Sequence, residues 1–552
     1  MVDAITTQVV RNRIGSLMQE MHYHFYRSGY STIIRESRDF SCVILDRRGG
    51  LIVAPPMFFH APVYRHLVGK IIEHYGEDIH AGDMFVCNHP YEGGLPHVSD
   101  MAFVAPILSG GTLIGFAGSI AHKADVGGTQ PGSTSATATE IFQEGLLLPP
   151  VKIYSRGIFN DDLERLILAN SRQPALVRGD MNAQMAATQI GATRILETCD
   201  RFGAAAVMEA FAALLAGAAA ELRAAIRALP AGEAYAEGFM DNDGIELDRP
   251  VRFAVTVRVE QGEITFDFTK ADRQARGPIN LRPSMVEACV FYSLIGALDP
   301  KLHFNDGMRE VVRFNYAPNT VTNASAPAAV SSYQAANLKL VDAILEALAP
   351  FRPERAVANG GSAGALSIAW TRGGRPGQPS LQYEILGSAY GGGNGNDGAS
   401  AVATHTSNLH ITPIEILETE FPCRIVAFDM VTDSGGAGQF RGGLSFRRTY
   451  EMLQDATVMR RYDRAKFPPN GVAGGKPGSR SRFIIRLGAK DERETPASGR
   501  YEMHAGERFM LQSAGGGGYG DPKRRDRAAL TRDIAEGYVS AAAAERDYGS
   551  KD

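Results

Sequence analysis

Residues 100–122, DMAFVAPILSGGTLIGFAGSIAH, contain two apolar runs separated by Gly110-Gly111. Apolar runs of this length on either side of a Gly-Gly pair predict two strands joined by a tight turn. Asp100 stands directly before the first run and His122 ends the second. If the two strands are neighbours in one sheet, these side chains converge at one sheet edge. The segment therefore predicts a β-sheet with a polar site beside it.

The sequence before this hairpin predicts a mixture of helices and strands. Residues 6–28 and 66–76 have apolar residues at helical spacing, and residues 84–90 are typical of a strand. Residues 40–55, FSCVILDRRGGLIVAP, consist of two apolar runs around a turn-rich link, which predicts a second hairpin.

The remaining chain shows three successive sequence patterns. Helical patterns dominate residues 160–229 and end at a Pro-Ala-Gly breaker. Residues 251–269 alternate apolar and polar residues around Gln261-Gly262, which predicts an antiparallel hairpin. Two predicted helices follow, and the last third is rich in strands and glycine before a polar, helical end.

These patterns predict a mixed α+β fold with mainly antiparallel sheets, and 552 residues exceed the length that one hydrophobic core supports. We expect three domains. They are an N-terminal domain that holds the polar site and the helical segment, a central α+β domain, and a strand-rich C-terminal domain with a helical arm, at residues 1–231, 232–352 and 353–552.

The composition excludes several classes of protein. A net charge of −4 and the lack of a basic stripe argue against nucleic-acid binding. The five cysteines lie far apart in sequence, and the first residues lack the order of a signal peptide, so we expect a reducing, cytoplasmic environment. The Ala-rich segment 202–229 is interrupted by charged residues, which predicts a long helix outside a membrane.

Nine of the thirteen histidines lie within the first 122 residues. His97 and Asp100 are three residues apart beside a predicted strand, and His122 ends another. With Asp39, which begins the first predicted strand, they offer two imidazoles and two carboxylates, a set that suits zinc, manganese or iron. The alternative is that each histidine is a hydrogen-bonded structural residue.

Two further carboxylates are candidates for catalysis. Asp125, three residues after His122, could orient an imidazole or could cap the Gly127-Gly128 turn. Glu140 could act as a general base, and it would share one helical face with Glu144 if that segment is helical. A solvated helix face is the alternative.

The sequence offers no convincing nucleotide site of its own. NGVAGGKPG, residues 470–478, has asparagine where a phosphate-binding loop needs its first glycine, and proline where it needs serine or threonine. GNGNDG, residues 393–398, matches a dinucleotide pattern but is not followed by a clear helix.

Several motifs in order resemble the hydantoinase B/5-oxoprolinase family across nearly the whole chain. They are VVRNRI, RDFSC, NHPYEGGLPHVSD, AHKADVGGTQPGSTSATATEIFQEGLLLPPVK, LANSR, ARGPIN, DSGGAGQFRGG and GGGGYGDP. Residues 88–152 carry the most specific part of this resemblance. The family includes subunits of ATP-dependent hydantoinases, 5-oxoprolinase, a caprolactamase, and large subunits of acetone and acetophenone carboxylases.

The resemblance implies a divalent metal held by Asp39, His97, Asp100 and His122. It also implies a separate hydantoinase A-like partner with an actin-like ATP site. We therefore expect the metal-containing subunit of an ATP-dependent enzyme that opens a cyclic amide, in a complex with two copies of each chain. The alternatives are the large subunit of an ATP-dependent ketone carboxylase, which would use bicarbonate, and a non-catalytic scaffold for the ATPase subunit.

Overall fold

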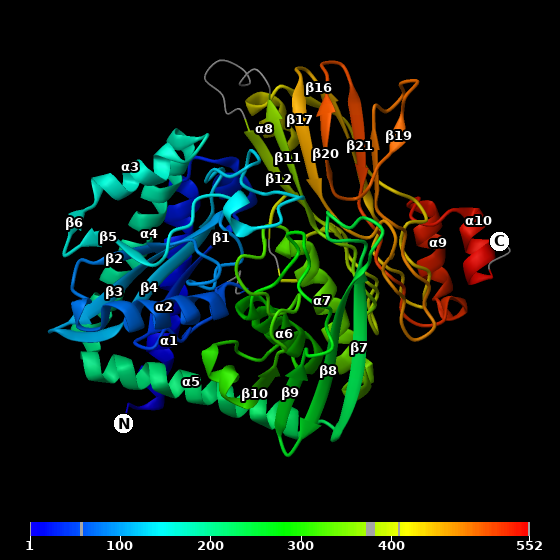
Figure 1. Cartoon of the computed structure of the whole chain (residues 1–552). Helices are drawn as coiled ribbons and strands as arrows, with labels where there is room; N and C mark the ends of the chain where they lie inside the picture. The colour runs from blue at the N-terminus through cyan, green and yellow to red at the C-terminus, as the bar shows by residue number, and fades with distance from the viewer. Residues whose placement is uncertain (1, 56–58, 371–380, 407–408, 550–552) are drawn as a thin grey trace.

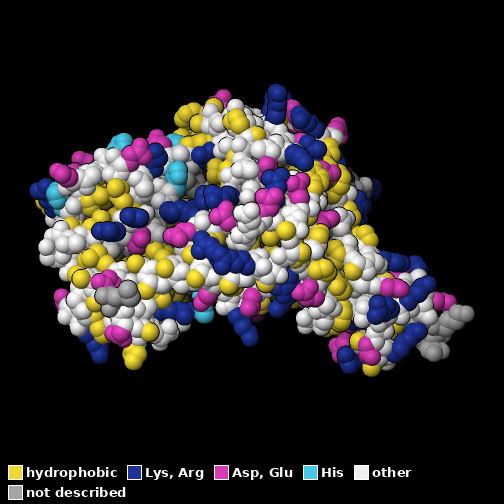
Figure 2. Space-filling view, turned by 90° about the horizontal axis from the view of Figure 1, so that it is seen from below, with side chains coloured by type: hydrophobic (Ala, Val, Ile, Leu, Met, Phe, Trp, Pro, Cys, Tyr) yellow, Lys and Arg dark blue, Asp and Glu magenta, His cyan; other side chains and the backbone are white. Residues whose placement is uncertain are grey.

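The computed structural model describes residues 2–55, 59–370, 381–406 and 409–549. Figure 1 shows the N-terminal sheet with its helices on one side of the molecule, the C-terminal strands on the other, and a central group of helices and strands between them. The mixed α+β fold with mainly antiparallel sheets confirms the prediction. Acidic and basic side chains both occur across the face that Figure 2 presents.

The N-terminal sheet has the strand order β1-β4-β3-β2-β5-β6, and all neighbouring pairs are antiparallel. The predicted Gly-Gly hairpin forms β3 and β4. The strands are β1 (Phe40–Asp46), β2 (Met84–Cys87), β3 (Asp100–Ser109), β4 (Thr112–His122), β5 (Val151–Ser155) and β6 (Ile158–Phe159).

Helices bury both faces of this sheet. Cys42 and Ile44 pack in one cluster with α1 (Ala4–Ser28) and α4 (Pro174–Phe202), whereas Val43 and Leu45 pack in another with α2 (Ala61–Tyr75). Because successive side chains of a strand point to opposite faces, a sheet covered on both faces needs apolar residues at every position. This arrangement explains the continuous apolar run of β1.

The predicted hairpin at residues 40–55 is wrong in its second half. Beyond β1, the returning chain forms no strand within its described residues. Its contacts with β1 are an isolated bridge between Leu45 and Leu51 and a hydrogen bond from the Ile52 N–H to the Ile44 carbonyl at 3.4 Å. Both backbone groups of Leu51 instead bond to Asp306: the Leu51 N–H donates to the side-chain Oδ2 at 2.7 Å, and the Leu51 carbonyl accepts from the Asp306 N–H at 3.0 Å. This pairing draws the chain away from β1.

The predicted helical segment forms three helices, α3 (Asp161–Ala169), α4 and α5 (Ala204–Arg227), with Gly203 at a φ of 84° between the last two. Among the described residues, α5 alone is long and apolar enough to cross a membrane by length and composition, a test that core helices also pass. In this fold α5 packs against α1, α4 and the short helix η4 (Asp306–Val311).

The central part joins a four-stranded sheet to two helices. The strand order is β10-β9-β8-β7, and the predicted hairpin at residues 251–269 forms β8 and β9. Helices α6 and α7 pack against each other, and α7 covers β7 and β8. The elements are β7 (Gly232–Met240), β8 (Val251–Glu260), β9 (Glu263–Asp267), α6 (Pro283–Leu298), β10 (Val312–Asn315) and α7 (Tyr333–Leu348).

The C-terminal part contains two larger sheets that enclose one apolar core and a small two-stranded sheet, and it ends in short helices. One sheet has the order β12-β11-β17-β20 and the other β15-β16-β21-β18-β19. The elements are β11 (Gly364–Trp370), β12 (Leu381–Leu386), β13 (Ser388–Ala389), β14 (Ser400–Val402), α8 (Ile414–Glu420), β15 (Cys423–Met430), β16 (Phe446–Met452), β17 (Ala456–Arg461), β18 (Arg482–Ile485), β19 (Arg493–Glu494), β20 (Gly499–Met503), β21 (Arg508–Gln512), α9 (Arg527–Ala535) and α10 (Ala541–Ala543).

The glycines of this part pack backbone against backbone. The four N–H groups of residues 515–518 donate to carbonyls of three different segments, at Asn359, at Gly443, and at Lys476 and Ser479. A Cβ on Gly516 would lie 2.0 Å from the carbonyl oxygen of Tyr390, and one on Gly517 would lie 2.0 Å from that of Asn470. The run GGGG is therefore required by close approach of neighbouring chains.

Residues of the first two predicted domains share one hydrophobic cluster, which extends from Val43 to Phe351. The two C-terminal sheets have a cluster of their own. The boundaries after residues 231 and 352 stay a prediction.

Candidate metal centre

Asp39, Asp100 and His122 lie side by side at one edge of the N-terminal sheet. The antiparallel register sets Asp100 opposite His122 and Phe40 opposite Ala121. The start of β3, the end of β4 and the start of β1 therefore coincide. The N–H of His122 also donates to the carbonyl oxygen of Asp39 at 3.2 Å.

His97 reaches the same edge from the turn before β3. Its Nε2 lies 3.1 Å from Oδ1 of Asp100, and Nδ1 of His122 lies 3.4 Å from that oxygen. One ligand atom from each of these three residues lies within 4.8 Å of the others. The three side chains are close enough to share one ion.

Asp39 extends this group. The short helix η1 (Ile33–Ser37) and Arg38, at a left-handed φ of 55°, turn the chain into β1. Asp39 Oδ2 then lies 3.9 Å from Nδ1 of His122. The structure thus brings together all four residues that the sequence suggested as ligands.

His60 joins the cluster, and the sequence analysis missed it. It directly precedes α2, and its Nε2 lies 3.6 Å from Oδ2 of Asp100. Its Nδ1 lies 3.0 Å from the hydroxyl of Ser41 on β1. Unlike His97, His60 has no acidic residue three positions away and stands between apolar residues, so no spacing signal marks it.

Several ring nitrogens and one carboxylate oxygen of the cluster are buried without a hydrogen-bond partner among the described residues. They are Nε2 of His60, both ring nitrogens of His97, Oδ2 of Asp100 and Nε2 of His122. Buried polar groups without partners are costly, and neutral imidazole and carboxylate are ligands of zinc, manganese and iron. The donor atoms therefore fit a divalent cation.

The pKa values of the cluster diverge. Burial, together with the charge of Asp100, holds the pKa of Asp39 well above its usual range. Burial would also raise the pKa of Asp100, but the imidazoles of His97, His122 and His60 hold it well below its usual range. Burial lowers the pKa of His122 to about 4, which keeps this imidazole in the neutral form that binds metal.

A cavity opens over the cluster, and all three parts of the chain line it. The ring of Tyr333, at the start of α7, meets His97 edge-on at 5.0 Å between centroids. The ring of Tyr383, on β12, stacks on His122. Arg461, at the end of β17, donates from Nη2 to the Tyr383 hydroxyl at 3.0 Å. The sequence analysis missed these three residues because they come from distant segments.

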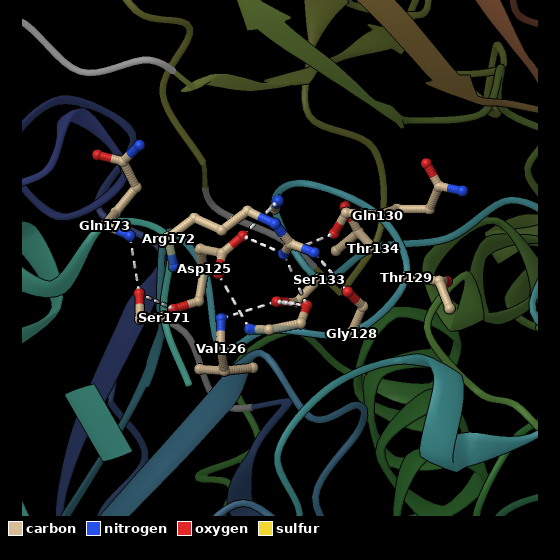
Figure 3. Close-up of polar contacts among 12 residues, drawn as sticks. Asp125, Val126, Gly128, Thr129, Gln130, Ser133, Thr134, Ser171, Arg172 and Gln173 are labelled. Carbon is tan, nitrogen blue, oxygen red and sulfur yellow. Dashed lines mark hydrogen bonds and ion pairs between the residues drawn. The ribbon is translucent and has the colours of Figure 1, made fainter. Parts of the chain in front are cut away.

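Asp125 lies in a loop that Arg172 holds together (Figure 3). Its Oδ1 accepts from the N–H groups of Gly127 and Arg172, and its Oδ2 accepts from the Gly132 N–H and from Nη1 of Arg172, at 2.9 to 3.0 Å. Nη1 of Arg172 also donates to the carbonyl oxygens of Gly127 and Gln130. These contacts favour the turn-capping alternative for Asp125.

Glu140 is exposed and is not among the residues that line the cavity. Only one 3₁₀ turn, η3 (Ile141–Gln143), separates it from Glu144, so the two do not share a helical face. Glu144 is the buried member of the pair. Its Oε1 accepts from the N–H groups of Val330 and Ser331 at 2.8 and 2.7 Å, and burial raises its pKa to about 7.

Comparisons with known proteins agree with this fold. The sequence is 30% identical to the B-type subunit of a putative D-/L-hydantoinase from Pseudomonas sp. (strain NS671), over 99% of this chain and 95% of that protein. The crystal structure of an ATP-dependent caprolactamase from Pseudomonas jessenii superposes with a TM-score of 0.92 at 27% identity, over 100% of this chain and 96% of that one.

A nucleotide-free acetone carboxylase superposes with a TM-score of 0.90 over 99% of this chain and 79% of that one, but at 18% identity this likeness shows the fold alone. The family model described as hydantoinase B/oxoprolinase matches residues 3–522. The chain therefore belongs to the hydantoinase B/oxoprolinase family.

Proposed function

We propose that this chain is the metal-holding subunit of an ATP-dependent, heteromeric enzyme that hydrolyses a cyclic amide of the hydantoin, oxoproline or lactam type. The observation that carries the proposal is the cluster of Asp39, His97, Asp100 and His122, of which all but Asp100 line a cavity. Membership of the family and similarity to a hydantoinase component and a caprolactamase support the type of substrate.

The chain's own residues would hold and shield the reacting centre. The carboxylates of Asp39 and Asp100 balance the charge of a divalent ion, and the imidazoles complete its ligands. Such an ion supplies a Lewis acid for the amide oxygen and lowers the pKa of a bound water. Tyr333 and Tyr383 cover the two imidazoles and limit access of bulk water.

An unstrained cyclic amide is a poor electrophile because resonance stabilises it. Phosphorylation of the amide oxygen by ATP would provide a leaving group. We assign this step to a separate hydantoinase A-like partner with an actin-like fold, in a complex with two copies of each chain. A labile phosphorylated species favours a closed interface between the two proteins.

Replacing His97 or Asp100 by alanine tests this proposal. Each variant should lose most of its bound zinc, manganese or iron in elemental analysis, and turnover of the reconstituted complex should fall with it. His74→Ala is the matched control, because His74 is exposed on α2. Full turnover after loss of the metal would contradict the proposal and favour a scaffold role.

A further inference from the structure

Arg461 brings a nearly buried positive charge to the cavity. Its side chain is 8% exposed. Its Nη1 donates to the carbonyl oxygen of Ser331 at 2.7 Å, and its Nη2 donates to the Tyr383 hydroxyl at 3.0 Å. Both partners are neutral, and Arg461 forms no salt bridge with a carboxylate of the described residues. A buried charge without a counter-charge is costly, so this position favours an anion.

The charges of the cavity point the same way. Asp39 and Asp100 together balance a divalent ion, which leaves the guanidinium of Arg461 uncompensated. The nearby carboxyl of Glu144 is held by the backbone N–H groups of Val330 and Ser331 instead of by Arg461.

Asn337 adds a second recognition point. It lies on α7, lines the same cavity and is 2% exposed. Its Oδ1 is buried without a hydrogen-bond partner among the described residues. An unpaired amide oxygen is an acceptor, so it complements the N–H of an amide ligand.

We propose that Arg461 and Asn337 form a subsite that recognises a substrate in which an oxyanion, of a carboxylate or a phosphoryl group, accompanies the ring amide. This inference rests on the proposed function and adds the charge of the substrate to it. Arg461 and the hydroxyl of Tyr383 bind the anionic oxygens, because a guanidinium is suited to carboxylate and phosphate geometry. Asn337 binds the amide edge of the ring.

Binding to the full-length chain, measured by calorimetry, tests the subsite. The probes are inorganic phosphate, 2-pyrrolidinone and its 5-carboxylate, with the chain both metal-loaded and chelator-treated. We expect the 5-carboxylate to bind at least tenfold more tightly than 2-pyrrolidinone. Arg461→Gln should bind the 5-carboxylate no more tightly than 2-pyrrolidinone, or should bind phosphate at least tenfold more weakly than the unaltered chain does. Its affinity for 2-pyrrolidinone should not change.

Comparing the binding of the 5-carboxylate with that of phosphate distinguishes the source of the anion. A loss confined to the 5-carboxylate identifies a substrate carboxylate, and a loss confined to phosphate identifies a phosphoryl group. Asn337→Leu should weaken both lactams and leave phosphate binding unchanged. The subsite is refuted if Arg461→Gln binds both anions as the unaltered chain does, or if that chain shows no preference for either anion.

Arg460→Gln is the matched control, since Arg460 is also buried on β17 but does not line the cavity, and its guanidinium packs over Tyr462 and Phe483. It should leave anion binding unchanged. Arg461→Lys retains the charge and should restore part of the affinity if Arg461→Gln folds poorly. Metal content is measured in every variant: loss of anion preference with normal metal content supports the subsite, whereas a chain without metal contradicts only the proposed function.

Discussion

The phenol ring of Tyr383 stacks on the imidazole of His122, with centroids 4.7 Å apart and ring planes 23° apart. Tyr383 comes from the C-terminal part and His122 from the edge of the N-terminal sheet. The Tyr383 hydroxyl also accepts a hydrogen bond from Arg461. One side chain thus fixes the plane of a candidate ligand and links it to the guanidinium.

Tyr383→Leu should weaken metal binding, whereas Tyr383→Phe should not. The leucine removes the stacking, worth about 0.5–1.5 kcal/mol, and frees the imidazole to rotate. The phenylalanine retains the stacking and loses only the hydrogen bond to Arg461. Competition with a chelator measures the affinity of each variant. Equal affinity in both would show that the stacking does not orient His122.

His60→Ala should lower metal affinity by about 10- to 100-fold, the usual effect of removing a group that orients a ligand. Its imidazole lies 3.6 Å from Asp100 Oδ2 and is anchored by Ser41. Elemental analysis after dialysis against a graded chelator gives the measurement. The exposed His74→Ala serves as control, and a matching result in both variants would exclude His60 from the centre.

Glu144→Gln should change how stability depends on pH. Burial raises the pKa of Glu144 from 4.5 to about 7, so the folded chain binds this proton more tightly than the unfolded chain. The stability that protonated Glu144 gives the fold is therefore complete below about pH 4.5 and is lost as the pH rises to about 7. As the pH rises from about 4.5 to about 7, the free energy of unfolding of the unaltered chain should fall by about 3 kcal/mol relative to that of Glu144→Gln.

Urea unfolding at several pH values measures this difference. Glu140→Gln is the control, because Glu140 lies in the same segment but is exposed. A difference between the unaltered chain and Glu144→Gln that stays constant over the window would refute the assignment.

Arg172→Ala should destabilise the fold by about 1–3 kcal/mol, a range reduced because the arginine side chain is 41% exposed. It removes the ion pair of the buried Asp125 and one of the two donors to each of the Gly127 and Gln130 carbonyls, which keep only their hydrogen bonds from Ser133. Metal content should stay normal in Arg172→Ala and in Asp125→Asn. A loss of metal from folded Asp125→Asn would instead favour a role in orienting an imidazole.

Gly516→Ala should prevent folding or cost more than about 4 kcal/mol, since the added Cβ meets the Tyr390 carbonyl at 2.0 Å and neither backbone can retreat. Gly217→Ala is the control. It lies in α5 with open space around it, and alanine there should stabilise the chain by about 0.5–1 kcal/mol. Normal stability of Gly516→Ala would contradict the packing described for residues 515–518.

The sequence predicts the part of the site that belongs to the N-terminal sheet, because local patterns determine it. The apolar runs of β3 and β4 and their Gly-Gly turn place Asp100 and His122 at the same sheet edge. The helices α4 and α5 follow from periodicity and an Ala-rich composition. These features depend on neighbours in the chain, which periodicity detects.

The rest of the site depends on contacts that periodicity does not encode. Tyr333, Tyr383 and Arg461 reach the cavity because α7, β12 and β17 are packed around the N-terminal sheet edge. The same limit explains why the second strand of the predicted hairpin is wrong, since the hydrogen bonds of Leu51 go to Asp306, more than two hundred residues away. Glu140 and Glu144 are indistinguishable by spacing, and burial alone separates them.

The order in which the cavity residues occur along the chain has a consequence for biosynthesis. Asp39, His97, Asp100 and His122 leave the ribosome early and can assemble with the first sheet, whereas Tyr383 and Arg461 emerge only in the last third of translation. In a nascent chain, the ligand atoms would thus be exposed to cellular metal ions before Tyr383 and Arg461 enclose them. Under the proposed function, the ligand atoms would be open to a metal before release from the ribosome and enclosed after it.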